Sequence, residues 1–253
     1  MKNFDEYAAV YDLINFDKNY RSEANYVSNH IRKRLPDAET LLDLGCGTGI
    51  HAQHFEDNGF RVVGIDRSHQ NLFIATRRFL DRTAGQPMFF AADIANFMVK
   101  RRFDAAVSLF HVFSYLNRTD ELLQAFRMAR KHLKKGGLFL FDGWYGPAVL
   151  SQKPQVTVKH VDTDDLDIIR INEPMLHPNR NLVDVRIKVM MTKKKTSFSR
   201  TFQETHSMRY FFLPEIEYYL NTNAFRLLRA TEWMTDAVLS EHSWSAYFVA
   251  EAI

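Results

Sequence analysis

The chain has a single cysteine, Cys46, among its 253 residues. One cysteine cannot form an intrachain disulfide, so the sequence fits a protein of a reducing compartment. Long apolar runs are missing as well. No stretch approaches the length of a membrane span, and the first residues lack the apolar core of a signal peptide. We therefore expect a cytoplasmic protein with no membrane partner.

A surplus of either charge is also missing, since 33 Lys and Arg face 30 Asp and Glu, for a net charge of +3. Such a balance does not indicate a basic surface for binding nucleic acid, and we expect no nucleic-acid partner. The 10 histidines are scattered without the spacing of metal ligands, so no metal site is predicted. What remains is an ordinary globular composition, 46% hydrophobic and 25% charged, long enough for one large α/β domain with an insertion.

Glycine is sparse, yet three glycines gather in one short stretch. Residues 41–49 read Leu-Leu-Asp-Leu-Gly-Cys-Gly-Thr-Gly, which predicts a strand buried on both faces, a glycine-rich turn and the start of a helix. Thr48 is expected to cap that helix, whose free N–H groups would attract a polar or anionic ligand. A dinucleotide fingerprint would need glycine where Ile50 stands, so a dehydrogenase is disfavoured, and the Gly-Lys-Ser/Thr of a P-loop is missing.

Acidic residues close the next two predicted strands. Asp66 ends the strand at 61–66, about where an α/β nucleotide-binding fold places its ribose-binding carboxylate. Asp93 ends the strand at 89–93. Because the carboxyl ends of parallel strands meet at one edge of a sheet, both acids should lie beside the glycine turn. Two carboxylates in that place suit one hydroxyl-rich, amine-bearing ligand.

Together with the segments 103–108 and 133–138, these motifs resemble the class I S-adenosylmethionine-dependent methyltransferases of the small-molecule type, in particular the sugar-nucleotide amine N-methyltransferases. The resemblance implies an α/β fold: a Rossmann-like sheet with helices on both faces, an antiparallel last strand and an inserted antiparallel β lid. It also implies S-adenosyl-L-methionine as cofactor, with the glycine turn near its methionine part, Asp66 on the ribose hydroxyls and Asp93 facing the adenine amino group. The cofactor-binding residues expected from it are Tyr20, Asp43, Gly45, Cys46, Gly47, Gly49, Asp66, Arg67, Asp93, Ile94, Leu109 and Phe110.

The loop at 110–116 follows the fourth predicted strand and should face the reacting methyl group. His111 is a candidate general base or substrate orienter, because imidazole titrates near neutral pH; the alternative is a histidine that only packs. Tyr115 is expected to orient an amine or hydroxyl. In the aromatic segment at 4–20, Tyr11 either approaches cofactor and substrate or anchors a short lid helix by packing.

Acceptor residues are expected from two later segments. The turn at 143–147 brings Trp144 and Tyr145 to the same edge, where they wall the acceptor site or close the end of the core. From 151 to 210 the pattern changes to strict alternation, which predicts an antiparallel β insertion. On its last strand Glu204 and His206 are acceptor candidates, although a simple interstrand salt bridge explains them equally well.

We therefore divide the chain into an N-terminal lid and cofactor-binding core at 1–150, a β insertion at 151–210 that covers the acceptor and is a candidate dimer contact, and the remaining core sheet at 211–253. The expected reaction is an SN2 transfer of the sulfonium methyl group to a nitrogen or oxygen of a small molecule, with an amino-sugar nucleotide as the first candidate. A small-molecule O-methyltransferase and a glycine-type N-methyltransferase stay open. A catalytically silent S-adenosylmethionine-binding module is the alternative from another class.

Overall fold

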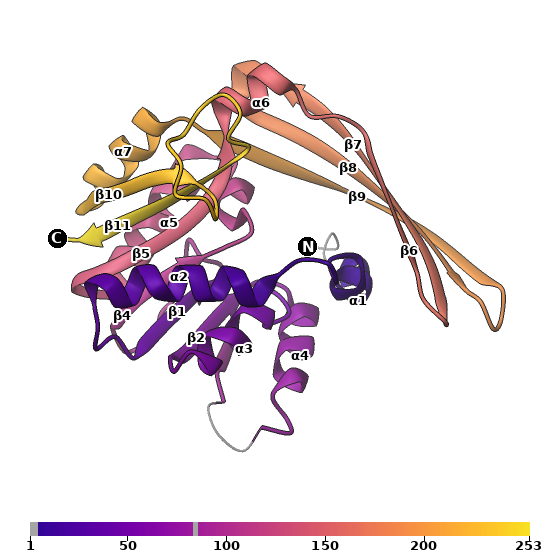
Figure 1. Ribbon diagram of the computed structural model, residues 1–253, viewed down its shortest axis with the longest axis horizontal. Coiled ribbons are helices and arrows are strands. Elements are labelled where there is room, and N and C mark those ends of the chain that lie inside the picture. The colour runs from indigo at the N-terminus through magenta and orange to yellow at the C-terminus, as the bar shows by residue number, and fades with distance from the viewer. Residues whose placement is uncertain (1–4, 83–85) are drawn as a thin grey trace.

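The computed structural model describes residues 5–82 and 86–253, and its centre is a twisted β-sheet (Figure 1). The core strands are β1 (Thr40–Leu44), β2 (Arg61–Asp66), β3 (Met88–Ala91), β4 (Phe103–Ser108), β5 (Leu133–Tyr145), β10 (Phe225–Glu232) and β11 (Ser245–Ala252). Strands β1 to β5 are parallel in the order β3-β2-β1-β4-β5, and β11 joins β5 antiparallel with β10 outside it. The Rossmann-like α/β sheet with an antiparallel last strand is thus confirmed.

Helices cover both faces of this sheet. The α-helices of the described residues are α1 (Asp5–Ile14), α2 (Tyr20–Arg34), α3 (Ile50–Asp57), α4 (His69–Arg78), α5 (Thr119–His132), α6 (Gly146–Gln152) and α7 (Leu213–Thr222). Along β1 successive side chains alternate between the two layers, as the period of a strand requires. Leu42 packs with Phe126 of α5 on one face, whereas Leu41 packs with Phe55 of α3 on the other. Both faces being buried explains the continuous leucine run in the sequence.

The insertion is a meander of four antiparallel strands that projects from the core (Figure 1). Its strands are β6 (Thr157–Asp162), β7 (Leu166–His177), β8 (Leu182–Lys193) and β9 (Phe198–Phe211). At its inner end β9 runs parallel to β5, where Trp144 pairs with Tyr210 and Tyr145 with Phe211. The insertion is therefore a continuation of the core sheet, joined to it through backbone hydrogen bonds.

Helix α1 packs against the inner face of this insertion. Val10 and Ile14 are buried in a cluster with Ile168 of β7 and Val189 of β8. A ten-residue helix is too short to be stable alone, so this apolar contact fixes its position. Because α1 also contacts α4, it lies between the insertion and the core.

Strand β5 begins directly after α5, which ends at His132, so residues 134–137 belong to the strand. Gly136 takes φ +76° there, and the pairing with β4 shifts register, so the glycines form an irregularity within the strand. The turn expected at 143–147 was wrong, since strand pairing keeps the chain extended up to Tyr145 and α6 begins at Gly146.

Thr48, predicted to cap α3, does not act as its cap. Gly49 is the N-cap of α3 in the left-handed conformation, and the Thr48 hydroxyl donates a hydrogen bond of 2.7 Å to Asp12 of α1 instead. Arg118 is the N-cap of α5, so Thr119 is its first helical residue. The tertiary contact of Thr48 with α1 could not be read from local sequence.

Candidate functional site

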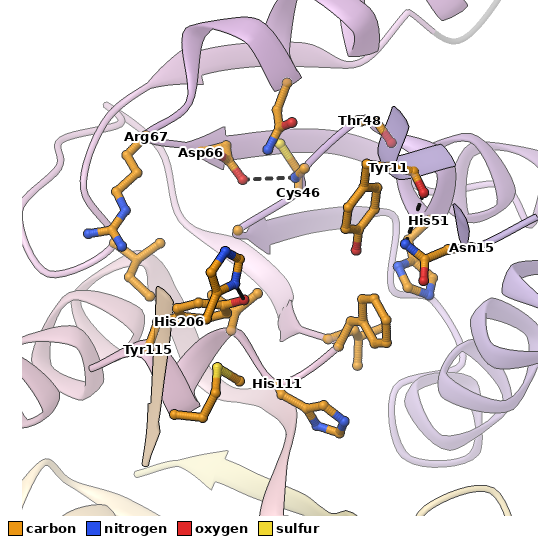
Figure 2. Close-up of a pocket in the computed structure, with 18 of the residues that line it drawn as sticks. Tyr11, Asn15, Cys46, Thr48, His51, Asp66, Arg67, His111, Tyr115 and His206 are labelled. Atoms are coloured by element: carbon orange, nitrogen blue, oxygen red, sulfur yellow. Dashed lines mark hydrogen bonds between the residues drawn. The ribbon is translucent and has the colours of Figure 1, made fainter. Parts of the chain in front are cut away.

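A cavity of about 410 Å³ lies beyond the carboxyl ends of β1, β2 and β4 (Figure 2). Its volume is in the range of sites for small molecules. The wall has three parts: the strand tips of the core, the end of α1 with the start of α2, and the inner face of the insertion. The core and the insertion therefore share one chamber.

The glycine turn borders this cavity through one bare stretch of backbone. A Cβ added to Gly47, at φ +54°, would meet nothing within 4 Å. By contrast, a Cβ on Gly45 would come within 2.5 Å of Val112, and one on Gly49 within 3.0 Å of Ala75. Gly49 lies outside the cavity wall, contrary to the expectation of a ligand contact. Only Gly47 leaves room for a ligand against the turn, while the other two glycines permit close packing.

Asp66 is the anchored acid of the cavity. Its Oδ2 accepts the Gly47 N–H at 2.9 Å and its Oδ1 accepts the Ser68 N–H at 2.8 Å. Burial raises the pKa of this carboxyl, and the two backbone hydrogen bonds oppose that rise. Each carboxylate oxygen keeps lone-pair capacity for another donor, such as a ribose hydroxyl. Figure 2 shows Asp66 with its dashed bond to the glycine turn, and Arg67 lines the cavity beside it.

Asp93 and Ile94 line the cavity at the next strand tip. The Asp93 side chain is exposed and accepts the Ala95 N–H at 2.8 Å, whereas Ile94 is buried. Strand β3 ends at Ala91, so Asp93 lies in the loop and not at the end of the strand as predicted, and Ile94 follows it in that loop. An acid next to an apolar surface suits an amine-bearing ring.

Asp43 is buried behind the turn and does not line the cavity, although a cofactor contact was expected. Its Oδ2 has no hydrogen-bond partner within the described part of the chain. Burial, with a smaller contribution from the charge of Asp66, raises the pKa of Asp43 to about 7. The Asp43 carboxyl, beneath the glycine turn, therefore gains or loses its proton near neutral pH.

The loop after β4 brings Leu109, Phe110 and His111 into the cavity wall. Phe110 and His111 both have left-handed backbone, at φ 66° and 63°. Two consecutive non-glycine residues in that region are costly and persist only where surrounding structure holds them. Here the carboxylate of Asp142, buried at the end of β5, accepts the His111 N–H at 3.1 Å, and its other oxygen lies 2.7 Å from His111 Nδ1.

Aromatic side chains from the N-terminal helices close one side of the cavity. Tyr11 of α1 meets Phe110 edge to face, with ring centroids 6.3 Å apart. Tyr20 begins α2, because Asn19 caps that helix, and packs at 4.9 Å against His51. Burial raises the pKa of the Tyr20 hydroxyl, which keeps it protonated as a donor. Cys46 also lines the cavity from the glycine turn.

The acceptor candidates divide into two groups. Trp144 and His206 line the cavity, whereas Tyr145 packs into the hydrophobic core and Glu204 lies behind His206, both outside the wall. Tyr115, at the end of the 3-10 helix η1 (Val112–Tyr115), lines the cavity, and its hydroxyl is 2.8 Å from His206 Nδ1. The predicted residues from the loop and from the insertion therefore meet (Figure 2).

Several polar residues of the wall were not predicted: Asn15, His51, Asn71, Arg170 and Asn172. A signal existed for the last two, since the two-residue period of β7 places them on the same face as the buried Ile168. Asn15 lies in the turn after α1, and His51 and Asn71 lie in α3 and α4, whose apolar stripes gave no indication of a cavity.

Within 5–82 and 86–253, no group of three or more His, Cys, Asp or Glu could hold a metal ion. In the same ranges, no helix combines the length and apolar character needed to cross a membrane.

Comparisons with known proteins give concordant findings. The family model described as "Methyltransferase domain" matches residues 41–137. The chain is 30% identical, over 84% of its length and 86% of the relative's, to dTDP-3-amino-3,4,6-trideoxy-alpha-D-glucopyranose N,N-dimethyltransferase of Streptomyces venezuelae. The crystal structure of Streptomyces venezuelae DesVI aligns over 98% of both chains with a TM-score of 0.81 and 25% identity. That of an S-adenosylmethionine-dependent methyltransferase from Clostridium acetobutylicum aligns over 98% of both chains with a TM-score of 0.82 and 22% identity.

Proposed function

The chain belongs to the class I S-adenosylmethionine-dependent methyltransferases, and from this premise we propose that it methylates the amino group of a nucleotide-linked amino sugar. Its cofactor is S-adenosyl-L-methionine. The name of the Streptomyces venezuelae relative supports an acceptor of this class, because the similarity extends over most of both chains. A nitrogen acceptor also suits the polar groups that the loop and the insertion contribute to the cavity.

One observation carries the proposal: the strand tips and the insertion line a single cavity. A methyl transfer needs donor and acceptor in line and in contact, and fixing them in one chamber replaces a bimolecular encounter with an oriented one. Tyr115 of the core and His206 of the insertion both line this chamber, and a hydrogen bond of 2.8 Å joins the Tyr115 hydroxyl to His206 Nδ1. The acceptor half is thereby held against the cofactor half.

The residues present fit the cofactor at the core side. The bare backbone of Gly47 leaves room for a ligand, Asp66 offers acceptor oxygens for ribose hydroxyls, and Asp93 offers one for an amino group. When bound, the cofactor supplies an electrophilic methyl group on a positively charged sulfur. Neutralisation of that charge during transfer is favoured where water is excluded, and Phe110 and Trp144 provide apolar wall for this purpose.

On the insertion side, Arg170 and Asn172 face the same cavity from β7. A guanidinium binds phosphate oxygens through paired charge-assisted hydrogen bonds. The side-chain amide of Asn172 can accept from a sugar hydroxyl, and its Oδ1 is buried without a hydrogen-bond partner in the described residues. Together these groups suit the sugar and the diphosphate of a nucleotide-linked acceptor.

The test is methyl transfer from labelled S-adenosylmethionine to a matched acceptor panel. The panel contains a nucleotide-linked amino sugar, its analogue with hydroxyl in place of the amine, the free amino sugar, and glycine. We expect transfer to the first with a kcat/KM at least tenfold above that of the others. Preference for the hydroxyl analogue or for glycine would overturn the proposed acceptor. Tight cofactor binding by calorimetry with no transfer to any amine or alcohol would indicate a silent binding module.

A further inference from the structure

His132, the last residue of α5, has both ring nitrogens within hydrogen-bond distance of backbone groups, and it is only 2% exposed. Its Nδ1 lies 2.8 Å from the carbonyl oxygen of Met128, one turn earlier in the same helix. On the other side of the ring, Nε2 accepts the backbone N–H of Val99 at 3.2 Å. The histidine therefore joins the end of α5 to the loop that follows β3.

The protonation state of this ring follows from its two partners. A carbonyl oxygen only accepts, so Nδ1 carries a proton, and a backbone N–H only donates, so Nε2 holds a lone pair. A proton added to Nε2 would face the Val99 N–H and break that hydrogen bond. Burial lowers the pKa of His132 below its ordinary value of 6.5; the bond to Met128 opposes this effect and the charge of Lys131 adds to it. The bonded ring is therefore neutral.

The charged residues around His132 do not titrate in its place. Lys131 precedes it on α5, three cations at 100–102 follow the loop, and in β5 the ammonium of Lys134 lies 2.6 Å from the carboxylate of Asp104. Lysine, arginine and aspartate side chains of this kind keep their charge between about pH 5 and pH 8. The histidine is therefore the group of this corner that changes charge in that range.

The loop at 92–99 carries Asp93 and Ile94 into the cavity wall. Its own hydrogen bonds make its first half compact. The Asp93 carboxylate accepts the Ala95 N–H at 2.8 Å, and the Asp93 carbonyl oxygen accepts the Asn96 N–H at 2.8 Å. A displacement of the second half of this loop would therefore move the two wall residues with it.

The second half of the loop is held by His132 at two points. Phe97 is 6% exposed and stacks on the imidazole, with ring centroids 4.3 Å apart and planes inclined at 21°. Two residues later, the Val99 N–H donates to Nε2 of the same ring. Because Phe97 shares the core cluster of Ile94, the stacked ring supports the apolar part of the cavity wall from behind.

We propose that His132 is a positioning residue for S-adenosylmethionine: as a neutral imidazole it holds the loop at 92–99 in the conformation that binds the cofactor, and its protonation releases the loop and weakens binding. His132 lies outside the cavity wall and acts through Phe97 and Val99. The inference concerns the core side of the cavity, so it holds for any acceptor.

The sign of the effect follows from linkage. A cofactor that binds the held loop more tightly favours the neutral ring, so its binding must lower the pKa of His132. Affinity is then constant while the ring is neutral, and it falls as the pH drops below the ordinary value of 6.5.

The first experiment measures the Kd of S-adenosylmethionine by titration calorimetry at about pH 7.5 and about pH 5.5. His132→Leu leaves the Val99 N–H unpaired and should raise the Kd about tenfold at the higher pH. His132→Gln offers an amide oxygen that does not titrate, so it should bind like the wild type at the higher pH and lose less affinity on acidification.

The decisive quantity is the difference between the wild type and His132→Gln, because Asp43 and His51 also titrate close to the cavity. His30→Gln is the matched control. Burial lowers the pKa of His30 as well, but this partly buried histidine of α2 lies outside the cavity wall. His30→Gln should follow the wild type at both pH values.

The second experiment needs only the wild-type chain, so it decides the matter even if His132→Leu does not fold. Nitrogen-15 NMR follows the His132 ring across pH with and without saturating S-adenosylmethionine. We expect a ring protonated on Nδ1 whose pKa falls when the cofactor binds. A histidine with a purely structural role would keep the same pKa in both states. A ring protonated on Nε2, an unchanged pKa, or equal acid sensitivity of the wild type and His132→Gln would each overturn the proposal.

Discussion

Asp142 holds His111 at two points: one carboxylate oxygen accepts the backbone N–H at 3.1 Å, and the other lies 2.7 Å from the imidazole Nδ1. Asp142 is 1% exposed and belongs to β5, so it is rigidly placed. It faces a loop whose backbone is left-handed at Phe110 and His111. The carboxylate therefore holds a costly backbone conformation through a hydrogen bond and lies within ion-pair distance of an imidazole that lines the cavity.

We expect Asp142→Asn to lower stability by about 1–3 kcal/mol, the cost of weakening a buried hydrogen bond to a charged group. The kcat should fall because His111 loses its orientation, while S-adenosylmethionine binding is retained. Thermal unfolding, calorimetry and steady-state kinetics measure these quantities. Asp167→Asn is the control, since Asp167 pairs at 2.7 Å with the exposed His160. Equal effects of the two substitutions would refute the special role of Asp142.

Asp66→Ala should weaken S-adenosylmethionine binding by about 1–3 kcal/mol, because the variant removes a partly buried charged acceptor from the cavity. The glycine turn also loses the partner of its Gly47 N–H. Titration calorimetry gives the affinity, and circular dichroism shows whether the fold persists. Asp57→Ala, which breaks partly exposed pairs with Arg82 and His54, should bind as the wild type does. Unchanged affinity in Asp66→Ala would remove this residue from the cofactor site.

Asp43 should make stability depend on pH. Its pKa is raised from 3.8 to about 7, so between these values the folded protein keeps a proton that the unfolded chain has lost. Stability therefore falls as pH rises through this window and levels off above it. The stability gain of Asp43→Asn over the wild type should be larger at about pH 8 than at about pH 5. Urea unfolding of both proteins measures it; a gain that shrinks with rising pH would contradict the assignment.

The contact of Asp12 with the core should control the release of α1. The Asp12 carboxylate accepts from the Thr48 hydroxyl at 2.7 Å and lies 2.6 Å from Arg78 Nη2. Arg78→Met should cost about 1 kcal/mol, which is about fivefold in the Kd of the cofactor, because Tyr11 on this helix lines the cavity.

Hydrogen exchange of the α1 amides and stopped-flow dissociation measure this effect. Arg77→Met is the control, because the neighbouring Arg77 packs on Phe73, which is exposed. If both variants release the cofactor at the wild-type rate, the Asp12 contact has no part in retention.

Much of the core follows from local pattern. The leucine run of β1 and the acids after β2 and β3 locate the cavity, because parallel strands end at one edge. The other elements depend on strand pairing between segments that are distant in the sequence. Trp144 and Tyr145 read as a turn beside Gly143 and Pro147, yet backbone pairing with β9 and β11 holds them in a strand.

Local sequence pattern was equally insufficient to predict the acceptor side of the cavity. Tyr115 and His206 were each singled out, but their bond joins residues 91 positions apart and depends on the register of β9. Arg170 carried no local signal beyond alternation. Side chains recruited across a chamber are determined by how the insertion meets the core, which short-range periodicity does not encode.

The unbroken course of β9, from the tip of the insertion to its pairing beside β5, has a consequence for engineering. Acceptor preference cannot be transferred by exchanging residues 151–210 alone. Such an exchange would break the pairing of β9 with β5 at Tyr210 and displace His206 from Tyr115. A productive chimera must exchange this strand together with the loop that ends at Tyr115. Chimeras that exchange β9 and this loop together should be active, whereas chimeras with a crossover point inside either segment should be inactive.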